Sequence, residues 1–286
     1  MDTRFWGPSG WKMLHLITFN YTYSAETAIT YSKFYETLPY ILPCKYCRSS
    51  LSDYYKEHPF QIPGGIYLNT NKAPFQNGKG VMNPVLNIER WLYTIHNSVN
   101  KKLKQQGLQN NPTPSFAQVT IYYTRLKKSP WYEQLALFWD FLFAVGYNHP
   151  KQTPSKPMPD CPKGIKTCRD KTELNKWNVL PLDDRMKWYN RFWISLPVIL
   201  PHEIAKRWAI VEKQHQPTLE SRRSTLAWLW RMRCGLDVDF KDPYTSVCKK
   251  IAAYSSDCGR SKYGKTCRKH RTRSQKTVKK TMKKTT

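Results

Sequence analysis

The sequence predicts a mainly α-helical protein with a helical bundle over residues 1–110, a mostly helical second domain over residues 111–259 and a basic disordered tail over residues 260–286. Apolar residues recur at intervals of three and four along most of the chain, whereas the period-two alternation typical of half-buried strands is scarce. The content of 40% hydrophobic and 14% aromatic residues is enough for a buried core, which excludes a wholly disordered chain.

Two helices are predicted before residue 40. Ser9 is expected to cap the first, on which Trp11 and His15 share one face because they are four residues apart. A second helical stretch runs over about residues 24–38, and Pro39 is expected to end it because proline cannot donate the next helical hydrogen bond. The chain therefore begins with a helical pair.

A third helix begins at the C-x-x-C pair, Cys44 and Cys47, and continues to about His58. Residues 60–82 have the proline and glycine content of a loop between helices. The clearest helix follows, because apolar side chains form one continuous stripe at helical spacing over residues 88–103. These elements complete the predicted bundle.

Asparagine and proline over residues 110–114 predict the end of the bundle. Two aromatic helical stretches follow, at about residues 116–127 and 131–147, and a proline- and lysine-rich segment over 149–164 separates them from a helical region over about 171–233. Cys234 and Cys248 in this half are expected to form a structural pair.

The formal charge of +27 is concentrated at the end of the chain, because residues 260–286 carry 12 Lys and Arg and no acidic residue. The first residues do not form a secretory signal, and no apolar stretch reaches the roughly 18–20 residues of a membrane span, so we expect a protein of the cytosolic side without a membrane anchor. Eight cysteines in such a chain suggest metal or redox chemistry before a secreted disulfide scaffold.

Three chemistries use the C-x-x-C spacing: half of a zinc site, a thioredoxin-type redox pair, and a disulfide beside a redox cofactor. The other cysteines supply no second closely spaced pair for zinc, and helical sequence stands where a thioredoxin-like site would have a strand. At a helix N-terminus, with Lys45 and Arg48 alongside, a thiolate is favoured over a thiol. Thiol exchange is therefore favoured over two inert core cysteines, and no metal site is expected.

Three segments occur here in the order and spacing of a known family. They are Trp11-Lys12-Met13-Leu14-His15, Pro43-Cys44-Lys45-Tyr46-Cys47 and Trp91-Leu92-Tyr93-Thr94-Ile95-His96-Asn97-Ser98-Val99-Asn100. Together they resemble the Erv/ALR family of FAD-linked sulfhydryl oxidases, and the long C-terminal region with its basic tail is most similar to the members from large DNA viruses, of the mimivirus type. The resemblance implies four helices around the flavin ring of FAD, with a fifth short helix that often follows.

The resemblance also implies roles for single residues. Cys47 would face the flavin and Cys44 would exchange with an outer dithiol, so that protein dithiols are oxidised and O2 is reduced to hydrogen peroxide. The positions that match contacts to FAD are Trp11, His15, Trp91, His96, Asn97, Val99 and Asn100, with Lys102 or Lys104 at the phosphates and Tyr21 near the adenine. Pro8 departs from the family, which usually has an arginine there.

Family members commonly relay electrons through a shuttle disulfide, for which Cys161/Cys168 and Cys258/Cys267 are the candidates and structural pairs or free thiols the alternative. The resemblance further implies a homodimer in the viral factory of the host cell, or in the virion. The tail over 260–286 is expected either to touch nucleic-acid phosphates without base recognition or to be merely solvated. The alternative for the whole chain is a basic virion-structural or nucleic-acid-binding protein whose bundle is not catalytic.

Overall fold

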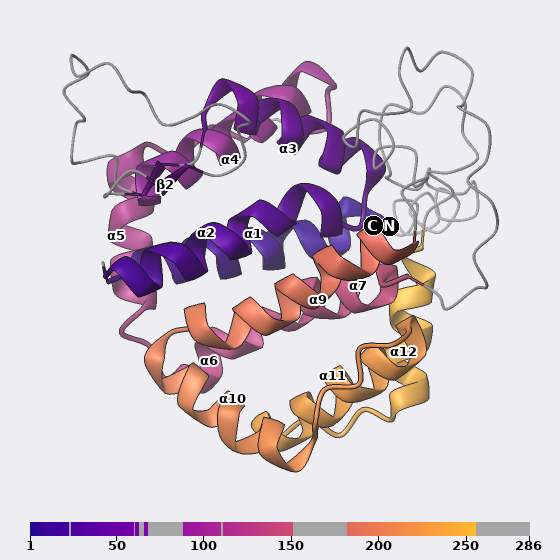
Figure 1. Cartoon of the computed structure of the whole chain (residues 1–286). Coiled ribbons are helices and arrows are strands. Elements are labelled where there is room, and N and C mark those ends of the chain that lie inside the picture. The colour runs from indigo at the N-terminus through magenta and orange to yellow at the C-terminus, as the bar shows by residue number, and fades with distance from the viewer. Residues whose placement is uncertain are drawn as a thin grey trace, which may run out of the picture.

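The structure, a computed structural model, describes residues 1–22, 24–59, 61–62, 66–67, 88–109, 111–150 and 182–255 (Figure 1). These residues are mainly helical, which confirms the predicted class. The helices are α1 (Thr3–Phe19), α2 (Ala25–Ile41), α3 (Lys45–Glu57), α4 (Ile88–Gln105), α5 (Phe116–Leu126), α6 (Trp131–Ala136), α7 (Trp139–Asn148), α9 (Leu182–Ile199), α10 (His202–Gln214), α11 (Arg222–Leu236) and α12 (Tyr244–Ala253). Two short strands, β1 (Gln61–Ile62) and β2 (Ile66–Tyr67), pair antiparallel where a loop is expected.

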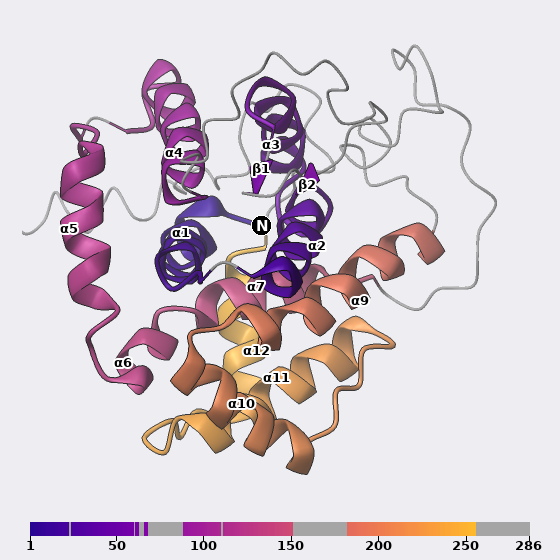
Figure 2. The same cartoon turned by 60° about the vertical axis from the view of Figure 1, so that its left-hand side comes forward.

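The helices lie in layers, as Figures 1 and 2 show from two directions. Helices α3 and α4 lie over α1 and α2, which in turn lie over α7 and α9, and α10, α11 and α12 form the far side. Helix α5 lies beside α1 (Figure 2). Helices α1 and α2 therefore occupy the middle of the molecule and are covered on both sides.

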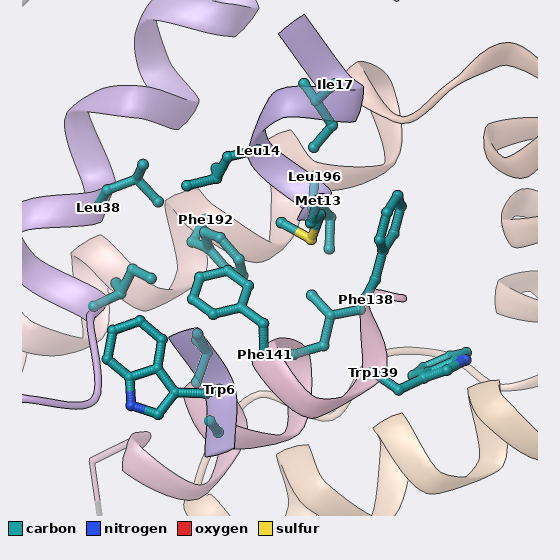
Figure 3. Packing of buried hydrophobic residues seen from close by; sticks show 14 of the residues in the cluster. Trp6, Met13, Leu14, Ile17, Leu38, Phe138, Trp139, Phe141, Phe192 and Leu196 are labelled. Carbon is teal, nitrogen blue, oxygen red and sulfur yellow. The ribbon is translucent and has the colours of Figure 1, made fainter. Parts of the chain in front are cut away.

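Buried aromatic side chains join the middle layer to the C-terminal helices. The rings of Phe34 in α2 and Phe192 in α9 stack with centroids 5.3 Å apart, and Phe141 in α7 meets Phe192 edge to face at 6.4 Å. Figure 3 shows Phe141 and Phe192 beside Leu14 and Leu38 of the first two helices. One core of buried side chains thus spans residues from both predicted domains, whose boundaries stay a prediction.

The first helix begins earlier than the sequence predicts. Its N-cap is Asp2, whose carboxylate accepts from the backbone N–H of Arg4, so the expected cap at Ser9 is wrong. The Ser9 hydroxyl instead donates to the carbonyl of Leu137 over 2.6 Å and accepts from the N–H of Phe141 over 3.0 Å. A tertiary contact, which local sequence does not encode, has replaced the local cap.

Helix boundaries differ at two other places. Helix α2 begins behind its cap Ser24 as expected, but it continues through Pro39 to Ile41, because a proline so near the C-terminus removes only one hydrogen bond of the last turn. The stretch expected over 131–147 is two helices, since the N–H groups of Leu137 and Phe138 bond three residues back and turn the chain. This turn gives Ser9 its partner.

Several expectations fall outside the described residues: Cys161, Cys168, Cys258, Cys267, the tail over 260–286 and most of the loop over 60–82. The expected pairing of Cys234 with Cys248 is wrong, because both are free, Cys234 exposed on α11 and Cys248 beside the Tyr244 hydroxyl on α12. Within the described residues, no helix combines the length and the apolarity that a membrane span requires.

Candidate active site

Cys44 and Cys47 lie at the N-terminus of α3, which confirms that the C-x-x-C pair opens a helix. Cys44 is the N-cap, and its Sγ accepts a hydrogen bond from the backbone N–H of Cys47 over 3.3 Å. The free N–H groups and the positive end of the helix dipole both favour a thiolate at this position. Both cysteines are free thiols in this structure.

The two sulfur atoms differ in acidity. Burial is the strongest influence on Cys44 and opposes ionisation, but hydrogen bonds from the Cys47 side chain and N–H, with the positive charges of the Met1 amino group and Arg48, lower its pKa to about 7. The hydrogen bond to Cys44 and burial raise the pKa of Cys47 well above its usual value. In the reduced pair, Cys44 therefore loses its proton before Cys47 does.

A cavity of about 600 Å³ lies beside the pair. It is bordered by residues of α1, α3, α4 and α5, by Leu38 of α2 and by Phe141 of α7, and both Cys44 and Cys47 line it. The volume is within the range of roughly 300–1,000 Å³ that is usual for small-molecule and cofactor sites. The two cysteines thus border a cavity of the size that ligand sites usually have.

Aromatic and imidazole rings form one wall of this cavity. Trp11 and His96 stack with their centroids 3.9 Å apart and their planes 10° apart. Behind them, Nε2 of His15 lies 3.0 Å from Nδ1 of His96, and the ring of Tyr123 in α5 covers the other side of His15. The wall offers a flat surface that a planar ring can stack on.

Both histidines of the wall are neutral. Burial, and then the neighbouring His96, lower the pKa of His15 to about 3, and burial lowers the pKa of His96 to about 4. One ring nitrogen of the pair can therefore donate and the other accept. Nδ1 of His15 is buried and has no hydrogen-bond partner among the described residues, but His15 does not itself line the cavity.

A lysine brings positive charge to the redox end of the cavity. Lys102 of α4 lines the cavity and donates to the hydroxyl of Ser50, one turn after Cys47 on α3. Its ammonium group favours a lower pKa for the Cys47 thiol, although the hydrogen bond to Cys44 and burial outweigh this and raise the pKa. A negative charge that forms near Cys47 would be stabilised there.

Comparison with known proteins places this site in a family. The sequence model of the Erv1 / Alr family matches residues 8–120. The protein named "Putative FAD-linked sulfhydryl oxidase 347L" of Invertebrate iridescent virus 6 is 30% identical over 105 residues, which is 36% of this chain and 83% of that relative. The chain belongs to the Erv1/Alr family. No solved structure matches it significantly.

The match to the Erv1/Alr family includes the helices that build the cavity except α7, the start of α1 before residue 8 and the C-terminal part of α5. It therefore extends past residue 110, where turn chemistry predicts the end of the bundle. Helices α9 to α12 lie outside the match, although α9 packs against α2 between Tyr31 and Ile41. This Erv1/Alr chain thus carries a C-terminal half that is built onto the family module.

The structure brings most of the predicted site residues to the cavity. Those that line it are Trp11, Cys44, Cys47, His96, Val99, Asn100 and Lys102, with His15 directly behind. Four lie elsewhere: Trp91 is buried and its indole donates to the carbonyl of His58, Tyr21 packs edge-on against Tyr31, Asn97 is half-buried on α4, and Lys104 is exposed. Their contacts with a cofactor stay a prediction.

Sequence reasoning missed Tyr122 and Tyr123 of α5 and Phe141 of α7, which also line the cavity. The aromatic stretch over 116–127 is visible in the sequence, but the turn residues before it assign it to the second domain. Phe141 sits in an entirely apolar run that carries no sign of a binding site. Only the packing of α7 against α1 reveals its role.

Proposed function

We propose that this chain is an FAD-dependent thiol oxidase that forms disulfides in protein substrates. The observation that supports this most is the position of the Cys44/Cys47 pair at the wall of a 600 Å³ cavity with a flat aromatic wall. The named function of the viral relative, an FAD-linked sulfhydryl oxidase, agrees with it.

The residues at the cavity fit FAD. A flavin or adenine ring can stack on an aromatic wall such as that of Trp11 and His96. Two of the cations that line the cavity, Lys12 and Lys102, suit its phosphates. When bound, FAD would take the electron pair of the reduced cysteines and pass it to O2, giving hydrogen peroxide.

The protein's own chemistry is thiol–disulfide exchange. A substrate thiolate attacks Cys44 of the oxidised pair, forming a mixed disulfide while the Cys44–Cys47 bond breaks and Cys47 leaves as a thiolate. A second substrate thiolate then attacks the substrate sulfur of the mixed disulfide, so that the substrate leaves with a disulfide and the Cys44/Cys47 pair keeps two electrons.

The surroundings of Cys47 favour its release as a thiolate during this step. The hydrogen bond that raises the pKa of Cys47 joins it to Cys44, and this bond is absent while Cys44 is bonded to substrate. The ammonium of Lys102 then remains to stabilise the Cys47 thiolate. Cys44 is 1% exposed and lines the cavity.

The experiment that tests the function is spectroscopic. Purified full-length protein is expected to be yellow and to consume O2 with dithiothreitol, with hydrogen peroxide as product. Cys44→Ser and Cys47→Ser should abolish turnover, whereas Cys248→Ser, which changes a free cysteine on α12, should not. A substrate protein that already carries a disulfide should form a mixed disulfide with the Cys44 thiolate of Cys47→Ser, with release of one substrate thiolate. A colourless protein that added FAD cannot activate would refute the proposal and favour the basic structural or nucleic-acid-binding protein.

The finer assignments belong to the same proposal. Protein dithiols are the substrates and O2 the acceptor, the protein is a homodimer, and it acts in the viral factory or virion. Cys161/Cys168 is the candidate shuttle, and turnover of a protein substrate that is unchanged in the double alanine variant would eliminate it. Contact of residues 260–286 with nucleic acid should disappear at high salt.

A further inference from the structure

The turn that leads into the redox pair is held at three successive carbonyl groups, all directly before Cys44. Each receives a hydrogen bond from a different part of the chain. The bonds are Tyr189 Oη to Ile41 over 3.3 Å, Arg48 Nη1 to Leu42 over 2.7 Å, and the Met1 amino group to Pro43 over 2.8 Å. Tyr189 belongs to α9 and therefore to the part of the chain outside the family match.

The Tyr189 hydroxyl is fixed by its surroundings. The residue is 1% exposed, its oxygen accepts from Nδ2 of Asn148 over 2.7 Å, and the ring of His149 packs edge-on against it at 5.0 Å. Burial raises the pKa of Tyr189, so the hydroxyl keeps its proton and acts as a donor at neutral pH. That proton is shared between the carbonyls of Ile41 and Asn148.

The same corner contains the charge that faces Cys44. Arg48 is 2% exposed, and its guanidinium interacts electrostatically with the Cys44 sulfur and the Tyr189 hydroxyl. Arg185 of α9 is a further cation near Arg48 and Tyr189, and Lys102 of α4 acts on Cys47. Helix α9 thus approaches the redox pair from the side opposite to α4, without lining the cavity.

We propose that Tyr189 is a positioning residue for the redox pair, which it serves by fixing the turn that places Cys44 as the cap of α3. The proposal rests on the thiol–disulfide exchange proposed for Cys44 and Cys47. If the carbonyl of Ile41 is released, the turn gains freedom, and the hydrogen bond from the Cys47 N–H to the Cys44 sulfur is formed for less of the time. The thiolate of Cys44 then loses part of its stabilisation.

The test compares Tyr189→Phe with Tyr31→Phe in the full-length protein. Tyr31 is a matched control, because it is also buried and its hydroxyl also bonds two carbonyls, those of Ile17 and Ile199, away from the redox turn. The reduced protein is alkylated with iodoacetamide over a pH series, and trypsin, which cuts after Lys45, separates Cys44 from Cys47 for mass spectrometry. The midpoint of the alkylation rate plotted against pH gives the pKa of the thiol. Access to the sulfur changes the rate but not this midpoint.

We expect Tyr189→Phe to raise the midpoint for Cys44 by about half a pH unit, which is roughly a threefold lower rate at pH 6. Tyr31→Phe should leave the midpoint at the wild-type value. Equal midpoints in all three proteins, or an equal shift in both variants, would overturn the proposal. If Tyr189→Phe does not fold, Asn148→Ser, which removes the amide that orients the hydroxyl, should show a smaller shift of the same sign, and an unchanged midpoint there would also overturn it.

This result is separable from the proposed function. The alkylation profile requires neither bound FAD nor turnover, so a protein that fails as an oxidase can still show the Tyr189 effect. If the protein is an active oxidase and the alkylation midpoint of Cys44 is the same in wild type and Tyr189→Phe, only the positioning role is refuted.

Discussion

Replacing Ser9 with alanine tests how firmly the C-terminal helices hold the wall of the cavity. The Ser9 side chain bridges α1 to the turn between α6 and α7, through the carbonyl of Leu137 and the N–H of Phe141. Phe141 lines the cavity, and a Cβ atom at Gly10 would lie 3.0 Å from its ring, so the two helices meet at van der Waals contact. Ser9→Ala removes both bonds and leaves this packing in place.

The expected cost follows from the two lost hydrogen bonds. Each contributes a net of about 1 kcal/mol, and the N–H of Phe141 keeps a second acceptor, the carbonyl of Phe138 at 3.1 Å. We therefore expect the free energy of unfolding to fall by about 2 kcal/mol, which lowers the melting temperature by about 4–8 °C for a domain of this size. Loosening of Phe141 should also weaken retention of FAD.

Guanidinium titration of the full-length protein measures this change. Thr94→Ala is the control, because the Thr94 hydroxyl bonds only the carbonyl of Arg90 one turn earlier on the same helix, and its loss should change stability by less than about 0.5 kcal/mol. Equal stability of Ser9→Ala and Thr94→Ala would show that α7 is not held by Ser9, and the reasoning would be wrong.

Three further predictions follow from burial and charge. Burial lowers the pKa of His149 to about 4, whereas in the unfolded chain this pKa is about 6.5. The contribution of neutral His149 to the free energy of unfolding is therefore complete above pH 6.5 and is lost as the pH falls toward 4. When the pH falls from 7 to 4.5, the free energy of unfolding of His149→Leu should therefore decrease by about 2 kcal/mol less than that of wild type, as guanidinium titrations measure it. Equal decreases in the two proteins would contradict this prediction. Gly146→Ala places a Cβ 2.7 Å from a buried leucine and should destabilise by about 1–2 kcal/mol, whereas Gly7→Ala, with nothing within 4 Å, should stabilise the helix by roughly 0.5 kcal/mol in thermal unfolding. Lys102→Met should lower the FAD affinity about tenfold and the exposed Lys104→Met less than twofold, measured as flavin fluorescence on dilution, and a reversed order would place the phosphates at Lys104.

Much of the site is predictable from the sequence because it is local. Cys44 and Cys47 mark a helix start by their position after Pro43, and residues four apart, such as His96 and Asn100, must share a face of α4. Helical spacing therefore brings these side chains toward one cavity without knowledge of the tertiary fold. Tyr21 and Trp91 show the limit of this reasoning, because spacing does not say whether an aromatic ring faces a ligand or the core.

What sequence reasoning misses is decided by contacts between distant segments. Turn residues over 110–114 indicate a boundary, yet Tyr123 beyond them stacks on His15 with centroids 4.8 Å apart. The hydroxyl of Ser9 has the chemistry of a cap, but its partners are more than 120 residues away in the chain. A turn motif limits only the local backbone and does not say which helices pack on each other afterwards.

Helix α2 connects the C-terminal half of the chain to the cysteine pair. On one side α2 carries Tyr35, whose ring meets Trp91 edge-on at 5.2 Å, and on the other Tyr40, whose ring stacks on Trp188 of α9 at 4.0 Å. The last residue of α2, Ile41, accepts the hydrogen bond of Tyr189 three residues before Cys44. If the proposed role of Tyr189 holds, a displacement of α9 would reach the start of α3, whereas no described residue of α9 lines the cavity on the far side of the cysteines. On one side, the two cysteines thus border a cavity built mostly by the segment that matches the family. On the other side, the turn before them is bonded to α9, which lies outside that match.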